Sequence, residues 1–588
     1  LGDNSLIVGT ANSTTFAGVI DDFGGNGGLI KQGTGTLTLT GSNTYTGGTA
    51  IIGGLINFAT LDNFGTGNVT LDGGGVQWAT GNTIDISPRL EAIGVNGGTF
   101  DTNGNDVTLA TAISGLGGIT KAGSGTLTFT GVNTYAGATI INDGTLALSG
   151  SGSIAASSGV ELRAAGATFD ISGSTGNQTI QDLWGVADSI VALGNRTLTA
   201  GTSNTTIFSG VIADNGLGGG LGGSFTKVGS GALILEGINT YTGATTISEG
   251  TLALENGGRI SESAVVTVAS GATFDISNNV FNNNIRTLAG AGTVQLGANV
   301  LRITDGSTEF SGTIDDGGNF GGIQIRGGTL TLSGTSTFSG PAEIRGGGTL
   351  ALKGAGSMVN AGVDFVGGLG TGTFDISQTN SGASILGLID TGFDGGIVAL
   401  GSKELTITVG SPFFSGVIQD GGIGGGTGGS LRIASLALQV LNGVNTYTGA
   451  TTIEGYAALI LEGNGSIATS SSLNLTGANA FFDIGCSCLT SVTVQNLSGV
   501  DSSYILLGAN TLTVVSSVDT TFAGVIEPLG DGGGLTKAGS ATLTLTGTNL
   551  YTGATTIETG TLALAGTGSI AASSGVNLTA AGATFDIS

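Results

Sequence analysis

Short runs in which apolar and polar residues alternate recur along the whole chain. Examples are "TLTL" at 36–39, "TLAL" at 145–148 and "ATFDI" at 167–171, and Gly, Asn, Ser and Asp separate such runs. Alternation with a period of two, in runs rich in Thr, Val, Ile, Leu and Phe, is typical of β-strands, whereas helical periodicity is absent. The pattern predicts an all-β fold in which the leucines face inward and the threonines outward, where Thr ladders could hydrogen-bond along the stack.

The strands return to the same phase about every 20 residues. "GTLTF" begins at Gly125, "GTLAL" at Gly144 and "GATFDIS" at Gly166, which are steps of 19 and 22 residues. A strand that recurs at this interval is the signature of a solenoid coil. We therefore predict a parallel β-helix, a β-solenoid of roughly 20-residue coils that spans 1–588 as one continuous domain. Roughly 29 coils at the ~4.8 Å spacing of neighbouring strands would make a rod on the order of 140 Å long.

A longer repeat of roughly 100 residues contains these coils. Near-copies of "TYTGATTI" occur six times, and their aromatic residues are 90, 106, 97, 109 and 104 residues apart. These aromatic residues are Tyr45, Tyr135, Tyr241, Phe338, Tyr447 and Tyr551. The repeat cores of the six predicted superrepeats are 27–54, 117–148, 222–254, 321–352, 428–461 and 533–564. The first superrepeat is longer than the others by about one coil, and we expect "GGGVQWAT" from Gly73 to form that coil.

The composition is that of a folded chain and argues against one class of partner. With 39% hydrophobic and only 9% charged residues, the chain can bury a long core despite its 116 glycines. Only 4 residues are proline, as expected where nearly every strand donates hydrogen bonds to its neighbours. The formal charge is −25 and the 15 lysines and arginines are scattered singly, so we expect no nucleic-acid partner.

The side chains allow little catalytic chemistry. The chain has no histidine, so Ser-His-Asp triads, Cys-His pairs and imidazole metal sites drop out. Carboxylate chemistry would need an isolated pair, and the candidates are Asp21 with Asp22 and Asp315 with Asp316. Related acidic, glycine-rich loops recur at Asp214, Asp420 and Asp531. We therefore interpret these aspartates as scaffold, expect the loops to form a projecting variable surface, and predict no catalytic, cofactor-binding or metal-binding residue, with calcium in the loops as the alternative.

Three other positions recur in most superrepeats. The aspartate of "FDIS" is expected to bond turn amides at a coil corner. The aromatic residue of "NTYTG" is expected to cover a coil edge or pack on its neighbours, with a sugar-stacking face as the alternative. The basic residue after each glycine-rich loop is expected to form a salt bridge with a nearby carboxylate. These aspartates are Asp170, Asp275, Asp375, Asp483 and Asp586, and the basic residues are Lys31, Lys121, Lys227, Arg326, Arg432 and Lys537.

One stretch resembles a known family of repeats. The sequence "GGITKAGSGTLTFTGVNTYAGATIINDGTLAL" at 117–148 resembles the passenger-associated transport repeat of bacterial autotransporters, also called the autotransporter-associated β-strand repeat. The resemblance implies a β-helical passenger that is exported across the inner membrane and threaded through an outer-membrane barrel, which we expect outside this segment. It also implies that the passenger ends at the cell surface, attached to the outer membrane or released.

The only two cysteines, Cys486 and Cys488 in "GCSC", are too few for a zinc or iron–sulfur site. Residues i and i+2 share one face of a strand, so a bond between them needs a turn, which Gly485 could supply. An exported location favours oxidation of the pair. We predict a disulfide between Cys486 and Cys488.

The repeats and the missing catalytic constellation together predict a function. We expect a non-catalytic cell-surface passenger that acts as a stiff structural or adhesive rod or fibre. The alternative is a surface polysaccharide-active enzyme or a carbohydrate-binding β-helix. The sequence opens and closes in mid-repeat, so we expect either an excerpt of a longer array or a protomer whose ends stack on neighbours. The expected partners are like chains, associated end to end or laterally, or ligands on a host or other surface, and no cofactor is expected.

Overall fold

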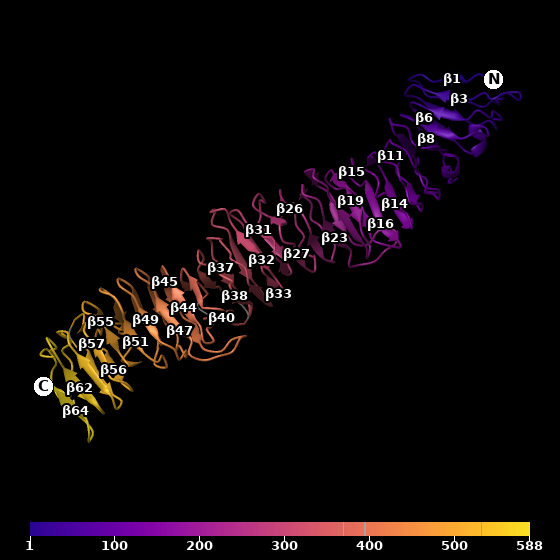
Figure 1. Cartoon of the computed structure of the whole chain (residues 1–588). Helices are drawn as coiled ribbons and strands as arrows, with labels where there is room; N and C mark the ends of the chain where they lie inside the picture. Colours follow the sequence, from indigo (N-terminus) through magenta and orange to yellow (C-terminus); the bar gives the residue numbers. More distant parts are fainter. Residues whose placement is uncertain (368–369, 393–394, 531) are drawn as a thin grey trace. The chain divides into compact units, whose positions relative to one another are not determined.

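The computed structural model describes residues 1–588 except 368–369, 393–394 and 531. Its contacts group the chain into two compact units, which are described separately. Figure 1 labels the strands along the chain. Unit 1 is Leu1–Arg286 with Gly292–Val294, and unit 2 is Thr287–Ala291 with Gln295–Ser588. That 1–588 forms one continuous solenoid stays a prediction.

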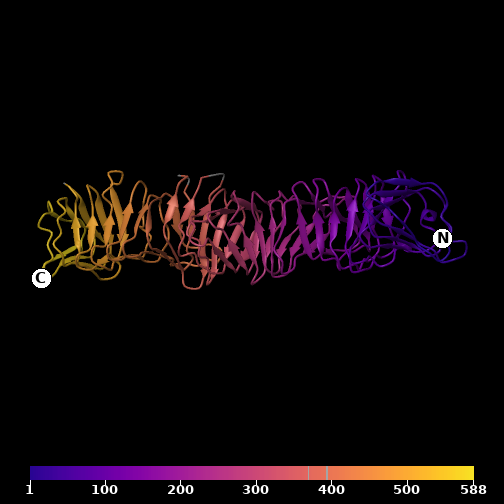
Figure 2. The same cartoon turned by 90° about the horizontal axis from the view of Figure 1, so that it is seen from above.

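Each unit is a parallel β-solenoid, which confirms the predicted fold class. The chain makes about 27 turns at a spacing of about 21 residues. Strands of successive turns pair in parallel, and Figure 2 shows from a second side that neighbouring strands in each unit run in the same direction. One sheet of unit 1 contains, in order, β10 (Val107–Leu109), β12 (Thr126–Phe129), β14 (Thr145–Gly150), β16 (Thr168–Ser174), β19 (Ile190–Ala192) and β22 (Val211–Ala213).

A second sheet of unit 1 contains the strands whose outward-facing residues are discussed below. It includes β11 (Ile119–Ala122), β13 (Thr139–Ile141), β15 (Gly159–Leu162), β18 (Asp182–Gly185), β21 (Thr206–Phe208) and β24 (Ala232–Leu235). In unit 2, one ladder contains β36 (Thr329–Leu332), β38 (Thr349–Gly354), β40 (Thr373–Thr379), β43 (Ile397–Ala399) and β46 (Val417–Gln419). Another contains β41 (Ala383–Ile385), β44 (Glu404–Ile407), β47 (Ser430–Ile433), β49 (Thr451–Ile453), β51 (Leu473–Leu475) and β54 (Ser498–Gly499).

The core consists of apolar columns that run from turn to turn. In β12, β14 and β16, Leu127 pairs with Leu146 and Leu146 with Phe169, and all three side chains are fully buried. Burying side chains of this size stabilises a fold by roughly 1.5–3 kcal/mol each. The threonines between them, such as Thr126 and Thr128, are half-buried on the outer face. The predicted orientation of leucines and threonines is therefore confirmed.

The turns are unequal in length, which is why there are fewer of them than the 29 estimated from the sequence. Leu127 and Leu146 are 19 residues apart, whereas Leu198 and Phe225, also register partners in neighbouring turns, are 27 apart. The longer turn contains the glycine-rich loop 214–223, which lies outside the strands.

The extra coil predicted in the first superrepeat is present. β8 (Gly75–Trp78) pairs in parallel with β6 (Leu55–Phe58) and β9 (Gly98–Asp101). The fully buried Trp78 lies with its ring centroid 5.4 Å from that of Phe58 and 6.4 Å from that of Phe100. Two short 3₁₀ helices, η1 (Leu61–Phe64) and η2 (Ser87–Arg89), flank this coil. A whole turn has thus been accommodated without interrupting the apolar column.

Candidate binding surface

The basic residue after the glycine-rich loop is buried in four superrepeats. Lys121 Nζ donates hydrogen bonds to the backbone carbonyls of Ala122 (3.0 Å), Gly123 (2.6 Å) and Asp143 (3.1 Å). Three other lysines repeat this pattern, with two acceptors in their own turn and a third in the next turn. The four residues are Lys31, Lys121, Lys227 and Lys537, each at most 1% exposed. Each ammonium group ties the corners of two successive turns together.

The predicted salt bridge is wrong for these four lysines. In the described part of the chain, none of them forms an ion pair, because the acceptors that line a coil corner are backbone carbonyls. Burial lowers the pKa of Lys121 to about 8. The prediction is confirmed at Arg432, which pairs with Glu454, while Arg326 donates to the side-chain oxygen of Gln324.

The tyrosines of the "NTYTG" motif are buried and form hydroxyl networks. The hydroxyl of Tyr135 lies 2.6 Å from Thr139 Oγ1, which lies 2.9 Å from Ser157 Oγ. Ser157 Oγ donates to the carbonyl of Gly137 at 2.9 Å, which closes the network on the backbone. The same network is formed by Tyr241–Thr245–Ser263, Tyr447–Thr451–Ser470 and Tyr551–Thr555–Ser573. These rings are at most 1% exposed, so the sugar-stacking alternative is wrong and the packing interpretation is confirmed.

The fourth superrepeat replaces all three hydroxyl groups together. Phe338 stands in the tyrosine position, Ala342 in the threonine position and Ala361 in the serine position, and all three are fully buried. The amide of Ala361 bonds to the carbonyl three residues earlier, as the amide of Ser157 does. A buried hydroxyl without a partner is costly, which explains why the three hydroxyl groups are lost together here. In the first superrepeat, which lacks the serine, Thr49 Oγ1 donates instead to the carbonyl of Phe64.

We expect Phe338→Tyr to destabilise unit 2 by about 2 kcal/mol, because it buries a hydroxyl group opposite Ala342 without a partner. Phe338→Tyr with Ala342→Thr restores the pair found in the other superrepeats and should recover at least half of that loss. Chemical unfolding followed by circular dichroism measures Phe338→Tyr, Ala342→Thr and the double variant. The account of the network would be contradicted if the double variant lost more free energy of unfolding than the two single variants lose together.

An aspartate closes each of the described glycine-rich loops. Asp214 accepts hydrogen bonds from the amides of Gly222 (3.1 Å) and Gly223 (2.9 Å) and from Thr242 Oγ1 (2.6 Å) in the next turn. Asp22, Asp316 and Asp420 accept the corresponding bonds from Thr46, Ser339 and Thr448. The Thr46 hydroxyl bond holds the pKa of Asp22 below its usual value. The scaffold interpretation is confirmed for these loops, whereas Asp531 lies outside the described residues.

The "FDIS" aspartates bond turn amides, as predicted, and two of them also hold a distant loop. Asp170 accepts from the amide of Ser172 at 2.8 Å, and its second oxygen accepts from the amide of Leu217 at 2.6 Å. Ser172 Oγ accepts from the amide of Gly218 at 2.7 Å. In unit 2, Asp375 and Ser377 bond Ile423 and Gly424 in the same way. This latch joins residues 46 to 48 positions apart and was missed by the sequence analysis.

The latched loops need glycine where they approach the aspartate. A Cβ atom at Gly216 would lie 2.6 Å from Ser172 Oγ and 2.8 Å from both carboxylate oxygens of Asp170. Gly216 also has a φ of +96°, which side chains rarely allow. The glycine-rich composition of the loop is therefore a requirement of the latch.

The tips of the glycine-rich loops carry exposed apolar side chains. Leu217 and Leu221 are 68% and 69% exposed, and Phe23 and Phe320 are 90% and 70% exposed. Phe23 and Phe320 have φ angles of 52° and 62°, a left-handed conformation that is uncommon for large side chains. The sequence signal was one or two large apolar residues in loops that otherwise consist of glycine, aspartate and asparagine. Among the described residues, no group of three or more His, Cys, Asp or Glu could hold a metal ion.

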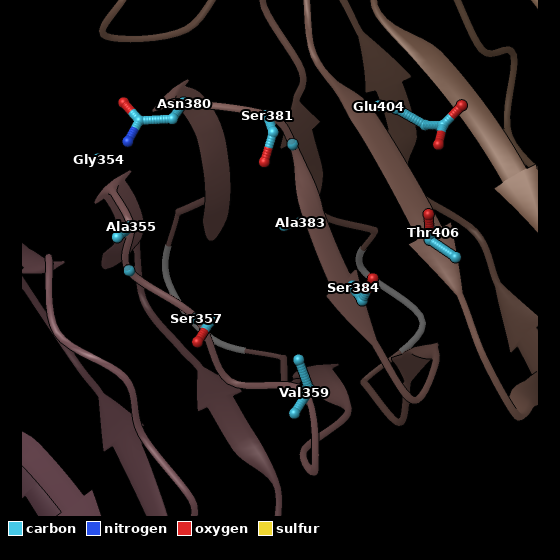
Figure 3. Close-up of a pocket in the computed structure, with 12 residues that line it drawn as sticks. Gly354, Ala355, Ser357, Val359, Asn380, Ser381, Ala383, Ser384, Glu404 and Thr406 are labelled. Atoms are coloured by element: carbon cyan, nitrogen blue, oxygen red, sulfur yellow. The ribbon is translucent and has the colours of Figure 1, made fainter.

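A polar pocket of about 520 Å³ opens in unit 2 between the turn after β38 and the start of β44 (Figure 3). β38 and β40 pair in parallel as far as Gly354 and Thr379, with a register shift between Ala351 and Lys353, and the pocket opens beyond this pairing. Figure 3 shows Asn380, Ser381, Glu404 and Thr406 around the opening. Glu404 lies 3.8 Å from Arg432, and the remaining lining is hydroxyl, amide, glycine and small apolar groups. The pocket can hydrogen-bond a polar ligand but contains no acid–base pair.

Cys486 and Cys488 lie at the turn that follows β52 (Phe481–Asp483), with their sulfurs 2.04 Å apart. Their disulfide in the secreted protein stays a prediction. We expect the purified chain to take up no alkylating agent before reduction and two equivalents after it, as measured by mass spectrometry. Two alkylated thiols before reduction would show that the pair is free.

Comparisons with known proteins agree with the repeat structure. The Passenger-associated-transport-repeat family matches 29–56, 119–148, 225–254, 327–352, 439–455 and 535–564. Each matched segment overlaps one of the six predicted repeat cores. No solved structure matches the chain. The two 3₁₀ helices are short, and no helix in the described chain is long and apolar enough to span a membrane.

The chain is also similar to a much longer protein. It is 31% identical over 591 residues to the "Adhesin BmaC autotransporter" of Brucella suis biovar 1 (strain 1330). The match covers 93% of this chain and 16% of that protein, so the chain spans about a sixth of the length of its relative. Autotransporter passengers lie at the cell surface or outside the cell. The repeats and this distant homology together identify the chain as an autotransporter passenger with passenger-associated transport repeats.

Proposed function

We propose that the chain is a non-catalytic passenger that acts as a stiff structural or adhesive element on a bacterial surface, attached to the outer membrane or released. The similar Brucella protein is named an adhesin, which supports the adhesive form of this role. Host or surface ligands, and like chains, are the partners that fit it.

The proposal is carried by the hydrogen-bond partners of the repeated polar side chains. The lysine corners, hydroxyl networks and aspartate latches all join one turn to another. They recur at matching positions in the superrepeats, which is expected of a scaffold rather than of one catalytic centre. Ties of this kind at regular intervals resist bending and local opening, since they add to the continuous strand pairing of each unit.

The polysaccharide-cleaving alternative receives no support from the candidate carboxylates. A glycosidase needs one protonated and one ionised carboxyl group facing the substrate. Asp22 and Asp316 instead accept hydrogen bonds from Thr46 and Ser339 and from loop amides, and they are at most 3% exposed. Their carboxylate oxygens already accept hydrogen bonds within the fold.

Surface display of the passenger on a non-adherent bacterium tests the proposal. We expect the displaying cells to adhere to host cells more strongly than cells that display an unrelated β-solenoid of similar size. The purified chain should release no reducing ends from bacterial or host polysaccharides. Adhesion no greater than that of the control would contradict the adhesive role, and polysaccharide cleavage would contradict the non-catalytic one.

A further inference from the structure

One outward-facing residue of unit 1 does not fit the scaffold pattern. On β18, Leu183 and Gly185 face inward, whereas Asp182 and Trp184 lie on the outer face. Trp184 is 40% exposed, while Trp78, the other tryptophan of the chain, is fully buried. Trp184 lines a pocket of about 390 Å³ that extends over β15, β18 and the start of β21.

The register of the neighbouring strand builds this pocket. Glu161 on β15 stands opposite Trp184, and Gly159 stands opposite Asp182. Because Gly159 has no side chain, the surface beside Asp182 stays open. Parallel neighbours are separated by about 4.8 Å, so the Glu161 carboxylate and the Trp184 ring are adjacent on one face.

The carboxylates around the ring are held in place by hydrogen bonds, and one of the two is paired with a cation. Glu161 accepts an ion-paired hydrogen bond from Arg163 at 2.6 Å. The two carboxylate oxygens of Asp182 accept from Thr202 Oγ1 and Asn204 Nδ2, both at 2.6 Å. These bonds fix the carboxylates without filling all of their lone pairs.

Several hydrogen-bonding groups in the pocket have no partner within the described chain. They are the indole N–H of Trp184, the side-chain amide of Gln181 and the second oxygen of Glu161, since both bonds from Arg163 go to one oxygen. The pocket therefore offers donors and acceptors together beside an exposed aromatic face.

We propose that this pocket binds a neutral carbohydrate. A pyranose ring has an apolar C–H face that packs on an indole, and its hydroxyl groups both donate and accept hydrogen bonds. Trp184 supplies the face, while Gln181, Glu161 and Asp182 are positioned for the hydroxyl groups. The inference rests on the proposed adhesive function, because it names the class of ligand that such a passenger would hold.

The charges around the pocket favour a neutral carbohydrate over an acidic sugar and over a cationic group. An acidic sugar would meet Glu161 and Asp182 and the net charge of −25. A cationic group would use only the acceptors and would leave the donors of Trp184 and Gln181 unpaired. One of the acceptors, Glu161, already has a cationic partner in Arg163. A neutral polyhydroxyl ligand uses every free group of the pocket.

Unit 2 contains a copy of this segment that lacks the aromatic face. "QDLWGV" at 181–186 corresponds to "QNLSGV" at 495–500, so Ser498 stands in the position of Trp184. Ser498 pairs in register with Asn474 and donates a hydrogen bond to it at 2.8 Å. The copy shows that the turn forms without tryptophan, so Trp184 is not required by the scaffold.

Glycan binding by the purified full chain tests the inference. The chain is applied to an array of immobilised probes. The probes are neutral hexose and N-acetylhexosamine oligosaccharides, sialylated and uronate oligosaccharides, and a trimethyl-lysine peptide. We expect binding to neutral oligosaccharides, and titration calorimetry with the strongest of them should give at least tenfold weaker binding for Trp184→Ala. Ser498→Ala is the matched control and should bind as the wild type does, and both variants should keep the wild-type circular dichroism spectrum.

The outcomes separate this inference from the proposed function. Equal binding by Trp184→Ala and the wild type would overturn the inference, as would no binding to neutral oligosaccharides or a preference for the acidic or cationic probes. These measurements use the soluble chain and do not depend on cell adhesion. Displaying cells that fail to adhere while the chain still binds sugar through Trp184 would overturn the adhesive role alone.

Discussion

Raising the pH above 10 should unfold the chain cooperatively, together with ionisation of its buried tyrosines. Burial raises the pKa of Tyr45 and Tyr551 to about 12 and raises the pKa of Tyr135, Tyr241 and Tyr447 further. The folded state therefore keeps these protons at a pH where the unfolded state, with a tyrosine pKa of about 10, has lost them. Because the unfolded state then binds fewer protons, the free energy of unfolding falls as the pH rises from about 10 towards the folded pKa.

The expected loss is large because the tyrosines act together. Each contributes about 1.4 kcal/mol per pH unit in this window. Unit 1 contains three of them and should lose about 4 kcal/mol per pH unit, and unit 2 contains two and should lose about 3 kcal/mol. Tyrosinate absorbance and circular dichroism, recorded together during an alkaline titration, should change in the same step. Ionisation of more than two of the 7 tyrosines with the β-sheet spectrum intact would contradict the prediction.

Lys121→Met should destabilise unit 1 by about 3 kcal/mol. The substitution keeps the volume of the side chain but removes the donor for the carbonyls of Ala122, Gly123 and Asp143. Within the described chain, the carbonyls of Gly123 and Asp143 have no other donor. These bonds are part-buried, and a hydrogen bond to a charged group contributes roughly 1.5–3 kcal/mol.

Lys353→Met is the matched control for this variant. Lys353 is exposed and pairs with the exposed Glu309 at 2.7 Å, an interaction worth less than about 1 kcal/mol. Denaturant unfolding should therefore separate the two variants clearly, and equal losses would show that the buried ammonium does not tie the turns together. The wild type should also gain stability between about pH 8 and 10, below the range in which the tyrosines dominate, because the unfolded state holds the Lys121 proton more tightly there.

Periodicity predicted the parts of the fold that depend on side-chain type. The alternation of Leu127 and Thr128 fixes which face is buried, and the return of Leu146 and Phe169 after about 20 residues fixes the stacking. The extra coil around Trp78 was predictable for the same reason, since a whole apolar strand was inserted in phase.

The partners of the repeated polar residues were harder to predict. The acceptors of Lys121 are backbone carbonyls, which every residue has, so the sequence contains no signal for them. The bond from Leu217 to Asp170 spans 47 residues and depends on how the glycine-rich loop folds back. The exposed ring of Trp184 could have been suspected from the comparison of "QDLWGV" with "QNLSGV", because one large aromatic residue replaces a serine.

The length of the purified chain in electron micrographs tests most directly whether its turns act as one stiff stack. About 27 turns at the ~4.8 Å spacing of parallel neighbours predict particles about 130 Å long, or filaments with that axial repeat if ends associate. Compact particles, or two short segments joined at variable angles, would contradict the continuous solenoid and the structural role built on it.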